Sequence, residues 1–365
     1  MRIALLTYST RPRGGVVHTL ALAEALVDLG LDVTVATICR DPSQAFFRPV
    51  DPRVRLVIAP MAEIEDEPFG DRIARSITTL ATACDWREFD VVHAQDCISA
   101  NAAGSCLRTV HHIDRFTTPQ LVACHERALV RPFAHVCVSA AVAGELRAGW
   151  GIEATVIPNG VDGARFRAAA GDTAGQAAWR TAVGGRYVLA LGGIEPRKGT
   201  RELVEAWPHV VARRPDLRLA IAGGETLFDH RPYRAEVEAR AAQLGVVPVM
   251  LGPVAHESLP ALVAGAAALA MPSTREGFGL AAMEALAAAT PVALSRLPVF
   301  REVFAGAAHF PEDDSPAALT AAILAATDGR ADPVRRQAGW SLAVSHTWSR
   351  AAAAHVDVYD RVARR

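Results

Sequence analysis

The sequence predicts an α/β protein with two successive doubly wound domains, each built on a mainly parallel sheet. Short apolar runs alternate with longer segments of helical periodicity, which is typical of parallel strands covered by helices on both faces. The chain has 365 residues, of which 51% are hydrophobic, and this is long for one core but sufficient for two. The alternation loosens between residues 163 and 185 and then begins again.

The first domain is expected to begin with a strand at residues 2–8 ("RIALLTY") and a helix at 18–30 ("HTLALAEALVDLG"). The helical segment carries apolar residues at helical spacing and ends on Gly30, a natural C-terminal stop. Further strands of this domain are expected at 32–38, 54–59, 90–95, 108–113, 135–140 and 154–159.

A second series of apolar runs follows the segment "IPNGVD" and predicts the second domain. Ligands of doubly wound sheets bind beyond the carboxyl ends of the strands, so two such domains facing each other would enclose a substrate in a cleft. The strands of the second domain are expected at 187–193, 217–224, 248–252, 267–273, 291–295 and 308–312.

The bulk composition argues against several classes of function. A formal net charge of −1 does not favour electrostatic capture of nucleic acid or of an anionic membrane. The six cysteines include no C-x-x-C pair, which indicates buried, reduced thiols in a cytosolic protein. The apolar run at the N-terminus is too short to span a bilayer, and we expect a cytoplasmic protein with at most peripheral membrane contact.

One stretch, "EGFGLAAMEA", places two glutamates eight positions apart around a glycine turn. We expect a strand to end at Pro272 and Ser273, a loop to carry Glu276, and a helix to begin near Leu280. A glycine turn at a helix N-terminus presents free backbone N–H groups to a phosphate. Glu276 and Glu284 would then bind polyols on either side of the phosphates, as a nucleotide sugar requires.

These motifs together resemble the retaining glycosyltransferases of family 4, which have the GT-B fold of two Rossmann-like domains facing across a cleft. The resemblance covers nearly the whole chain. It implies an N-terminal acceptor domain at 1–165, a C-terminal donor domain at 170–345, and a closing helix at about 346–365 that packs back on the first domain. The segments that carry it are "PRGGVVHTL", "VIPNGVD", "EPRKG", "LGPV", "MPS", "EGFGL" and "HTWSRAAAAHVDVYDRV".

The resemblance implies a role for particular residues. Lys198 and Arg197 would neutralise the diphosphate as the bond to the sugar breaks, because charge-assisted bonds to a leaving group are strongest in a closed site. Glu276 would hold the donor sugar, and His111 would lie near the reacting carbon, with His112 as a competitor because side chains alternate along a strand. The implied donor-binding residues are Gly14, Gly15, Asn159, Val254, Gly277, Phe278, Gly279, Leu280 and Glu284.

One position departs from the family pattern. Many relatives carry an arginine after the glycine that ends the first strand of the second domain, and here that position is Gly193. Arg197 would supply the missing cation from the turn. The departure also motivates an alternative, a nucleotide-sugar-binding accessory protein without catalysis; a GT-B phosphorylase or epimerase is a further alternative.

The favoured function is transfer of a hexosyl group from a nucleoside diphosphate sugar to an acceptor hydroxyl with retention of the anomeric configuration. A UDP-sugar is the favoured donor and a GDP-sugar the second choice. The acceptor would be a small molecule, a lipid or a glycan, the sequence leaves the oligomeric state open, and no metal or other cofactor is expected.

Overall fold

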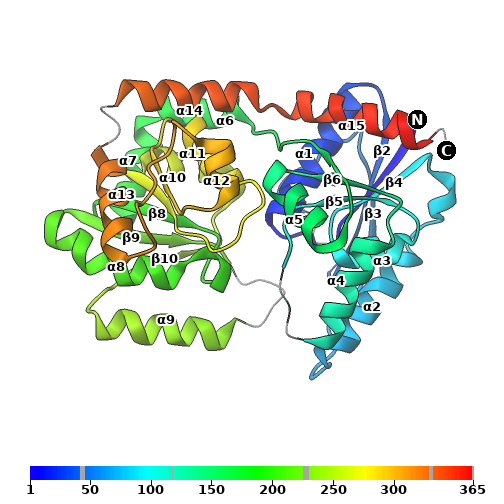
Figure 1. Ribbon diagram of the computed structural model, residues 1–365, viewed down its shortest axis with the longest axis horizontal. Coiled ribbons are helices and arrows are strands. Elements are labelled where there is room, and N and C mark those ends of the chain that lie inside the picture. Colours follow the sequence, from blue (N-terminus) through cyan, green and yellow to red (C-terminus); the bar gives the residue numbers. More distant parts are fainter. Residues whose placement is uncertain (42–45, 115, 117, 225–229, 329–331, 364–365) are drawn as a thin grey trace. The chain divides into compact units, whose positions relative to one another are not determined.

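The computed structural model describes residues 1–41, 46–114, 116, 118–224, 230–328 and 332–363. The chain divides into two compact units: unit 1 comprises Met1–Gly160 and Trp348–Arg365, and unit 2 comprises Val161–Thr347 (Figure 1). The first boundary falls earlier than the sequence predicted. Within unit 2 the Val161 N–H donates to the His346 carbonyl at 2.9 Å, so this unit is tied together where it begins and ends.

Unit 1 contains a seven-stranded sheet in the order β3-β2-β1-β4-β5-β6-β7, and all its strand pairs are parallel. Central strands such as β1 and β4 are buried almost throughout, as expected for a parallel sheet covered on both faces. The strands are β1 (Arg2–Leu6), β2 (Asp32–Cys39), β3 (Arg55–Pro60), β4 (Val91–Ala94), β5 (Leu107–Val110), β6 (Ala134–Cys137) and β7 (Thr155–Val156).

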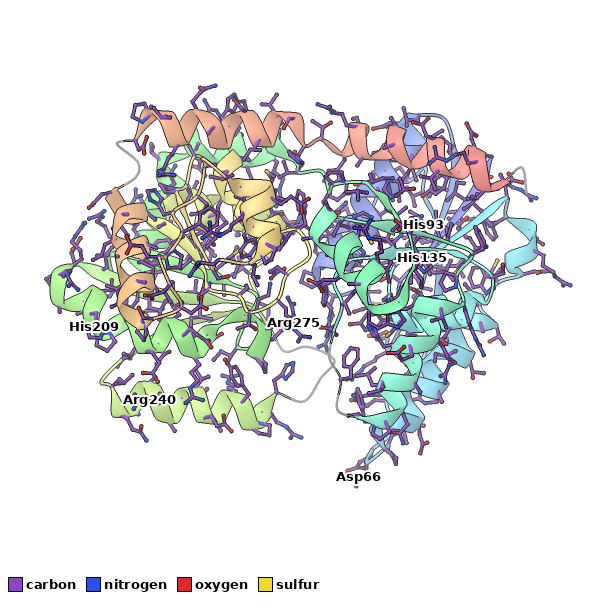
Figure 2. All side chains as sticks on the ribbon, viewed as in Figure 1. Asp66, His93, His135, His209, Arg240 and Arg275 are labelled. Atoms are coloured by element: carbon purple, nitrogen blue, oxygen red, sulfur yellow. The ribbon has the colours of Figure 1, made fainter. Side chains whose placement is uncertain are left out.

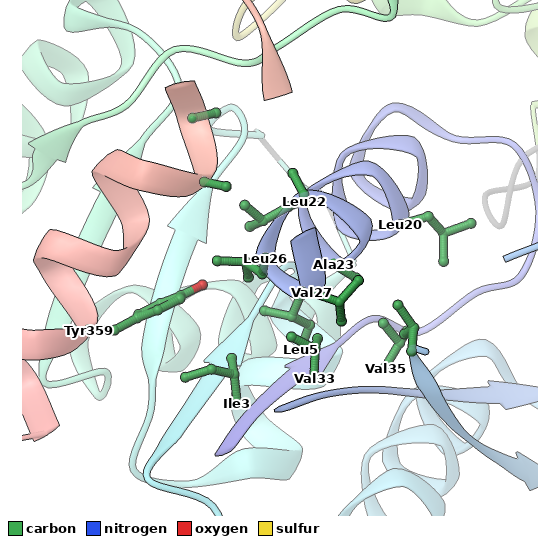
Figure 3. Close-up of a cluster of buried hydrophobic side chains, with 14 of the residues drawn as sticks. Ile3, Leu5, Leu20, Leu22, Ala23, Leu26, Val27, Val33, Val35 and Tyr359 are labelled. Atoms are coloured by element: carbon green, nitrogen blue, oxygen red, sulfur yellow. The ribbon is translucent and has the colours of Figure 1, made fainter. Parts of the chain in front are cut away.

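The helices of unit 1 include the closing helix α15, which packs on α1. Tyr359 of α15 is fully buried in the same core cluster as Ile3, Leu22 and Leu26, as Figure 3 shows. The helical elements are α1 (Gly14–Asp28), α2 (Phe69–Ala81), η1 (Trp86–Glu88), α3 (Cys97–Ala103), α4 (Pro119–Val130), α5 (Ala140–Trp150) and α15 (Trp348–Ala363).

Unit 2 contains a five-stranded parallel sheet in the order β10-β9-β8-β11-β12. Its strands are β8 (Arg186–Leu191), β9 (Leu217–Ala222), β10 (Val249–Gly252), β11 (Ala268–Met271) and β12 (Val292–Leu294). Its helical elements are α6 (Gly163–Gly171), α7 (Thr173–Val183), η2 (Pro196–Lys198), α8 (Thr200–Arg213), α9 (Arg231–Gln243), η3 (His256–Ser258), α10 (Leu259–Gly265), α11 (Leu280–Ala287), α12 (Pro298–Phe304), α13 (Pro316–Asp328) and α14 (Pro333–Ser345).

One expected strand is absent, and several others end earlier than expected, among them those at 108–113, 135–140 and 154–159. Residues 308–312 do not form a strand and contribute only an isolated bridge between Ala293 and His309. Pro311 has no N–H to donate, which prevents the pairing from continuing. The strand expected at 108–113 ends at Val110, so His111 and His112 lie in the loop that follows it.

The strand orders place the carboxyl ends of particular strands at the switch point of each sheet. In unit 1 the order reverses between β1 and β4, and in unit 2 between β8 and β11. Ligands of doubly wound sheets bind at this point. The segments singled out from sequence follow these strands: Gly14–Gly15 after β1, the "EPRKG" turn after β8, and the "EGFG" loop after β11. Among the described residues, no helix combines the length and apolar character that crossing a bilayer requires.

Candidate active site

Two loops of unit 2 meet at the carboxyl ends of the neighbouring strands β8 and β11. The Arg197 carbonyl in the turn after β8 accepts a 2.9 Å hydrogen bond from the Thr274 N–H in the loop after β11. Gly199 follows with a φ of +67°, and a Cβ at this position would collide with the Pro272 carbonyl. Glycine therefore permits the close approach of the two loops.

An ion cluster connects these loops. Lys198 Nζ lies 2.6 Å from Glu276 Oε1, and a terminal nitrogen of Arg197 lies 3.3 Å from the same oxygen. Arg197 Nε lies 3.1 Å from Glu195 Oε2. The side chains of Glu195, Glu276 and Lys198 are only 9%, 12% and 15% exposed, so solvent screens these charges less than those of surface ion pairs. The structure thus brings together three residues identified from sequence and adds Glu195.

Lys198 is the only lysine among the 38 lysine and arginine residues of the sequence. Its aliphatic chain lies against Gly192, where a Cβ would be 2.7 Å from Lys198 Cε. An ammonium is a compact point charge, whereas a guanidinium is a wide planar fork. The single lysine of the sequence thus places the smaller of the two cations against Gly192.

The loop after β11 leads into the N-terminus of α11. Gly279 has a φ of +98°, and a Cβ there would lie 2.9 Å from ring atoms of Phe300 and Phe304. Phe278 is buried with its ring centroid 6.4 Å from that of Phe304 and 5.7 Å from that of His346. Within the described residues no side chain caps this helix. The first amides of α11, beginning at Leu280, can therefore bind an anion.

Glu284 lies one turn into α11 in a different setting from Glu276. Burial raises the pKa of Glu284 to about 7, while Arg165 lowers it and Asp162 raises it to smaller extents. The side chain is partly buried, and a carboxyl group in such a setting is half-protonated near neutral pH. An Arg165 terminal nitrogen donates to the His256 carbonyl, two residues beyond Val254.

The loop after β10 contains Val254, which the resemblance places beside the base of the donor. Val254 is partly buried, and its neighbour Pro253 would lie 3.1 Å from a Cβ at Gly224. This loop therefore packs against the end of β9, next to the glycines that follow β8 and β9 along the same edge of the sheet. Gly277 is buried in the loop after β11.

In unit 1, three loops converge at the ends of β1, β4 and β5. A Cβ at Gly15 would lie 3.6 Å from His111 Cδ2, and His111 Nε2 lies 3.2 Å from Gln95 Oε1. His112 instead pairs with Asp114 at 3.0 Å. Of the two histidines that the sequence left in competition, His111 is therefore the one beside Gly15, at the N-terminus of α1. Gly14, the first residue of α1, has open space at its Cβ position.

Asn159 is buried in unit 1, where its Oδ1 lies 2.9 Å from His18 Nδ1. The resemblance assigned Asn159 to donor binding, and in the structure its side chain is hydrogen-bonded to His18 within unit 1. The His18 ring lies in edge-to-face contact with the rings of His111, at 4.8 Å, and Trp348, at 5.4 Å.

Buried neutral imidazoles extend from this region into the core of unit 1. His93, marked in Figure 2, lies 2.9 Å from the Tyr359 hydroxyl and 2.7 Å from Thr109 Oγ1. Burial lowers the pKa values of His18 and His93 well below 6.5, that of His111 to about 3 and that of His355 to about 4. These side chains are therefore uncharged at neutral pH.

Sequence reasoning missed three residues near the predicted site: Glu195, Gln95 and His18. Glu195 stood inside the quoted "EPRKG" segment, and Gln95 ended a predicted strand, so both positions carried a signal. Gln95 is buried, and its Nε2 has no partner within the described part of the chain. His18 carried no signal, since its position in a helix predicts packing as readily as function.

The thiols and possible metal ligands are distributed as follows. No disulfide links the six cysteines; Cys106, Cys124 and Cys137 are buried, whereas the other three are partly exposed, so the expectation of buried thiols was only partly correct. In the part of the chain that the structure describes, no three or more histidine, cysteine, aspartate or glutamate side chains are arranged to hold a metal ion.

Both halves of the chain match known families. The family described as "Glycosyltransferase Family 4" matches residues 12–165, and that described as "Glycosyl transferases group 1" matches residues 176–339. A phosphatidyl-myo-inositol mannosyltransferase from Mycolicibacterium smegmatis is 30% identical over 329 residues, which cover 84% of this chain and 78% of the relative. A glycogen synthase from Mycobacterium tuberculosis is 28% identical, with 98% and 94% of the two chains covered.

Solved structures show the same fold. Sucrose-phosphate synthase from Thermosynechococcus elongatus aligns with a TM-score of 0.79 at 18% identity, covering 99% of this chain and 98% of that one. Anabaena HepE in complex with UDP-glucose aligns with a TM-score of 0.74 at 17% identity, covering 98% and 100%. The two parallel sheets, the uncapped helix after β11 and the matches along both halves agree, and the chain belongs to the GT-B glycosyltransferases of family 4.

Proposed function

We propose that this glycosyltransferase moves a hexosyl group from a nucleoside diphosphate sugar to an acceptor hydroxyl, with retention of the anomeric configuration. The observation that carries the proposal is the ion cluster of Lys198, Arg197 and Glu276 beside the uncapped N-terminus of α11. Two cations and a row of free amides suit a diphosphate. Membership of a transferase family argues against the non-catalytic, phosphorylase and epimerase alternatives.

Unit 2 is the proposed donor-binding unit. Glu284 would accept hydrogen bonds from the ribose hydroxyls, and Glu276 would hold the sugar. A UDP-sugar is favoured, supported by the UDP-glucose complex of Anabaena HepE, and a GDP-sugar is the second choice. The roles of Gly14, Gly15 and His111 in unit 1 stay predictions from the family resemblance.

We favour a front-face reaction in which the departing phosphate accepts the proton of the acceptor hydroxyl. Glu276 already shares its carboxylate between two cations, which suits a positioning group better than a nucleophile. Asp96 in unit 1 is also poorly suited to act as a nucleophile. One of its carboxylate oxygens accepts a hydrogen bond from the Tyr8 N–H and the other from the Ser99 N–H. Lys198 and Arg197 would stabilise the negative charge that develops on the leaving diphosphate.

The acceptor is proposed to be a small molecule, a lipid or a glycan, and the protein is proposed to act in the cytoplasm. A lipid acceptor gains support from the Mycolicibacterium smegmatis relative, whose name specifies phosphatidyl-myo-inositol. Such an acceptor would require peripheral contact with a membrane surface.

The proposal is tested by screening nucleoside diphosphate sugars for their effect on the thermal unfolding of the protein. A ligand that binds only the native state raises the apparent melting temperature. The donor so identified is then offered with acceptors, released nucleoside diphosphate is quantified, and the anomeric configuration of the product is assigned by NMR. An inverted product would contradict the retaining mechanism, and the absence of binding by every donor would contradict the function.

Donor affinity is expected to increase with pH because of Glu284. Its pKa of about 7 means that it is mainly protonated at pH 6 and mainly ionised at pH 8, and the carboxylate is the better acceptor for two ribose hydroxyls. If only the ionised form binds, affinity rises by about tenfold between pH 6 and pH 8. Calorimetry with the intact nucleotide sugar measures this, since its phosphates do not titrate in that range.

The matched control for this experiment is Glu284→Gln, which keeps the shape of the side chain but cannot ionise. We expect the variant to bind the donor weakly and with the same affinity at both pH values. A pH dependence that persists in Glu284→Gln would show that another group is responsible.

Transfer is expected to proceed without a divalent metal, because Lys198 and Arg197 already place two positive charges at the proposed diphosphate site. Activity of the purified enzyme should therefore be the same, within error, before and after dialysis against excess EDTA. Loss of activity with EDTA and its recovery on adding Mg²⁺ or Mn²⁺ would assign the neutralising role to a metal instead.

A further inference from the structure

We propose that Glu195 is a positioning residue that holds the Arg197 guanidinium at the donor diphosphate. The inference rests on the proposed function, since it assigns a role within the donor site. It is carried by the packing around Gly193, by the contacts of Arg197, and by the charges of the cluster.

Gly193 cannot be replaced by a residue with a side chain while the backbone stays as it is. Its φ is +74°, and a Cβ would lie 2.9 Å from the Gly224 carbonyl oxygen. Gly223 faces the same restriction, because a Cβ there would meet the backbone of Gly192 and Gly193. The chain segments that follow β8 and β9 thus pack backbone to backbone, so position 193 has no room for a cationic side chain and the turn presents Arg197 beside Lys198 instead.

The Arg197 side chain contacts two carboxylates. Its Nε lies 3.1 Å from Glu195 Oε2, and a terminal nitrogen lies 3.3 Å from Glu276 Oε1. A guanidinium is planar, so a carboxylate that holds Nε fixes the direction in which the two terminal nitrogens point. The Glu195 side chain is 9% exposed and the Arg197 side chain 31% exposed. Glu195 is therefore the more buried partner of the pair, and Arg197 extends from it towards solvent.

The backbone of the turn restrains both residues further. The Lys198 N–H donates to the Glu195 carbonyl at 3.0 Å, and the Arg197 carbonyl accepts from Thr274 in the neighbouring loop. Pro196 lies between Glu195 and Arg197 and fixes φ at its position. The order E-P-R-K therefore sets an acid, its arginine and the single lysine within one rigid turn.

The charges of the cluster make the role of Glu195 testable, because an orienting role and a purely electrostatic role predict opposite changes in diphosphate affinity when Glu195 is removed. Glu195 and Glu276 balance Arg197 and Lys198, and in the proposed function Glu276 turns to the sugar while the diphosphate takes its place. A carboxylate near a diphosphate repels it, so removing Glu195 strengthens binding if only the net charge matters. Removing it weakens binding if its function is to orient Arg197, because the long side chain then loses its fixed rotamer.

The experiment measures binding of inorganic pyrophosphate, UDP and GDP by calorimetry, and of the identified donor by kinetics. We expect Glu195→Ala to weaken pyrophosphate and nucleoside diphosphate binding by about tenfold and to lower kcat as well as raise KM. Glu195→Gln keeps an oxygen that accepts from Arg197 Nε and should lie close to wild type. Glu202→Ala, which removes an exposed acid in the first turn of α8, is the matched control and should not weaken binding.

A double-mutant cycle separates positioning from general destabilisation. In an Arg197→Ala background, Glu195→Ala should have no further effect on pyrophosphate affinity. Arg197→Lys keeps the charge but not the fork and should lose affinity too, which provides the test if Glu195→Ala does not fold. Unchanged or tighter pyrophosphate binding by Glu195→Ala, full affinity in Arg197→Lys, or additive losses in the double variant would each overturn the inference.

The two proposals fail in different ways. If the wild-type protein binds neither pyrophosphate nor any nucleoside diphosphate, the proposed donor site is wrong and the role of Glu195 with it. If the wild-type protein binds them and Glu195→Ala binds them equally well, the donor site stands and only the positioning role is rejected.

Discussion

Lys198→Ala is expected to lower kcat/KM by about 10² to 10³-fold, the loss typical of removing one preorganised charge partner from a transition state. The Lys198 side chain is 15% exposed, and its Nζ lies 2.6 Å from Glu276 Oε1 in the proposed diphosphate site, so little solvent is present to replace it. Steady-state kinetics with the identified donor measures the loss. Most of it should be in kcat, since the charge on the diphosphate grows as the glycosidic bond breaks.

Two further variants sharpen this test. Lys198→Arg should also lose activity, because the lysine stem is packed against Gly192 and a guanidinium is wider than an ammonium. Arg201→Ala, which removes an exposed cation three residues further along, should retain wild-type rates. Full activity in Lys198→Ala would exclude this residue from the diphosphate site.

Acid is expected to unfold unit 1 well above the pH at which its carboxylates become protonated. His18, His93 and His355 are buried, and their pKa values lie far below the 6.5 of an unfolded chain. As the pH falls below 6.5, the unfolded state binds protons that the folded state does not, so the free energy of unfolding decreases. At pH 5 the loss is about 2 kcal/mol for each such histidine, and together these losses approach the stability of a typical domain.

Urea unfolding followed by tryptophan fluorescence at pH 7.5, 6.0 and 5.0 measures this dependence. His355→Gln should reduce the slope of the free energy of unfolding against pH, whatever it does to stability at pH 7.5. His209→Gln, which replaces an exposed histidine of unit 2 (Figure 2), should leave the slope unchanged. Equal free energies of unfolding at pH 7.5 and pH 5.0 would contradict the burial of neutral imidazoles in unit 1.

Much of the fold could be predicted because hydrophobic periodicity is a local property of the chain. The parallel sheets and the helix beginning at Leu280 follow from runs of apolar residues and from glycine turns. The strand expected at 308–312 is absent for a reason that is also visible in the sequence. Pro311 lacks an N–H group and interrupts the row of backbone donors that a strand needs. Strand order and register depend on contacts between distant segments and were not available from local patterns.

The candidate site was predictable where a motif lies within one loop. The charged residues and glycines of "EGFGL" and "EPRKG" are consecutive in the sequence, so the chemistry of each loop could be inferred from it. In the structure, Arg197 and Lys198 lie within ion-pairing distance of Glu276. Glu195 lies within the "EPRKG" segment, but its role could not be read from the sequence, because it requires the side chain of Arg197 to fold back on it.

The sequence by itself determined the fold class, the family and the segments that surround the proposed donor. Only the tertiary structure decided which side chains in those segments act on one another: His111 beside Gly15, Glu195 against Arg197, and Gly193 against the backbone of Gly224. The reason is that periodicity and turn chemistry act between near neighbours in the chain. The contacts of His111 with Gly15 and of Gly193 with Gly224 arise because strands that are distant in sequence end side by side at the edge of a sheet, and the Glu195–Arg197 pair depends on the side-chain rotamers within one turn.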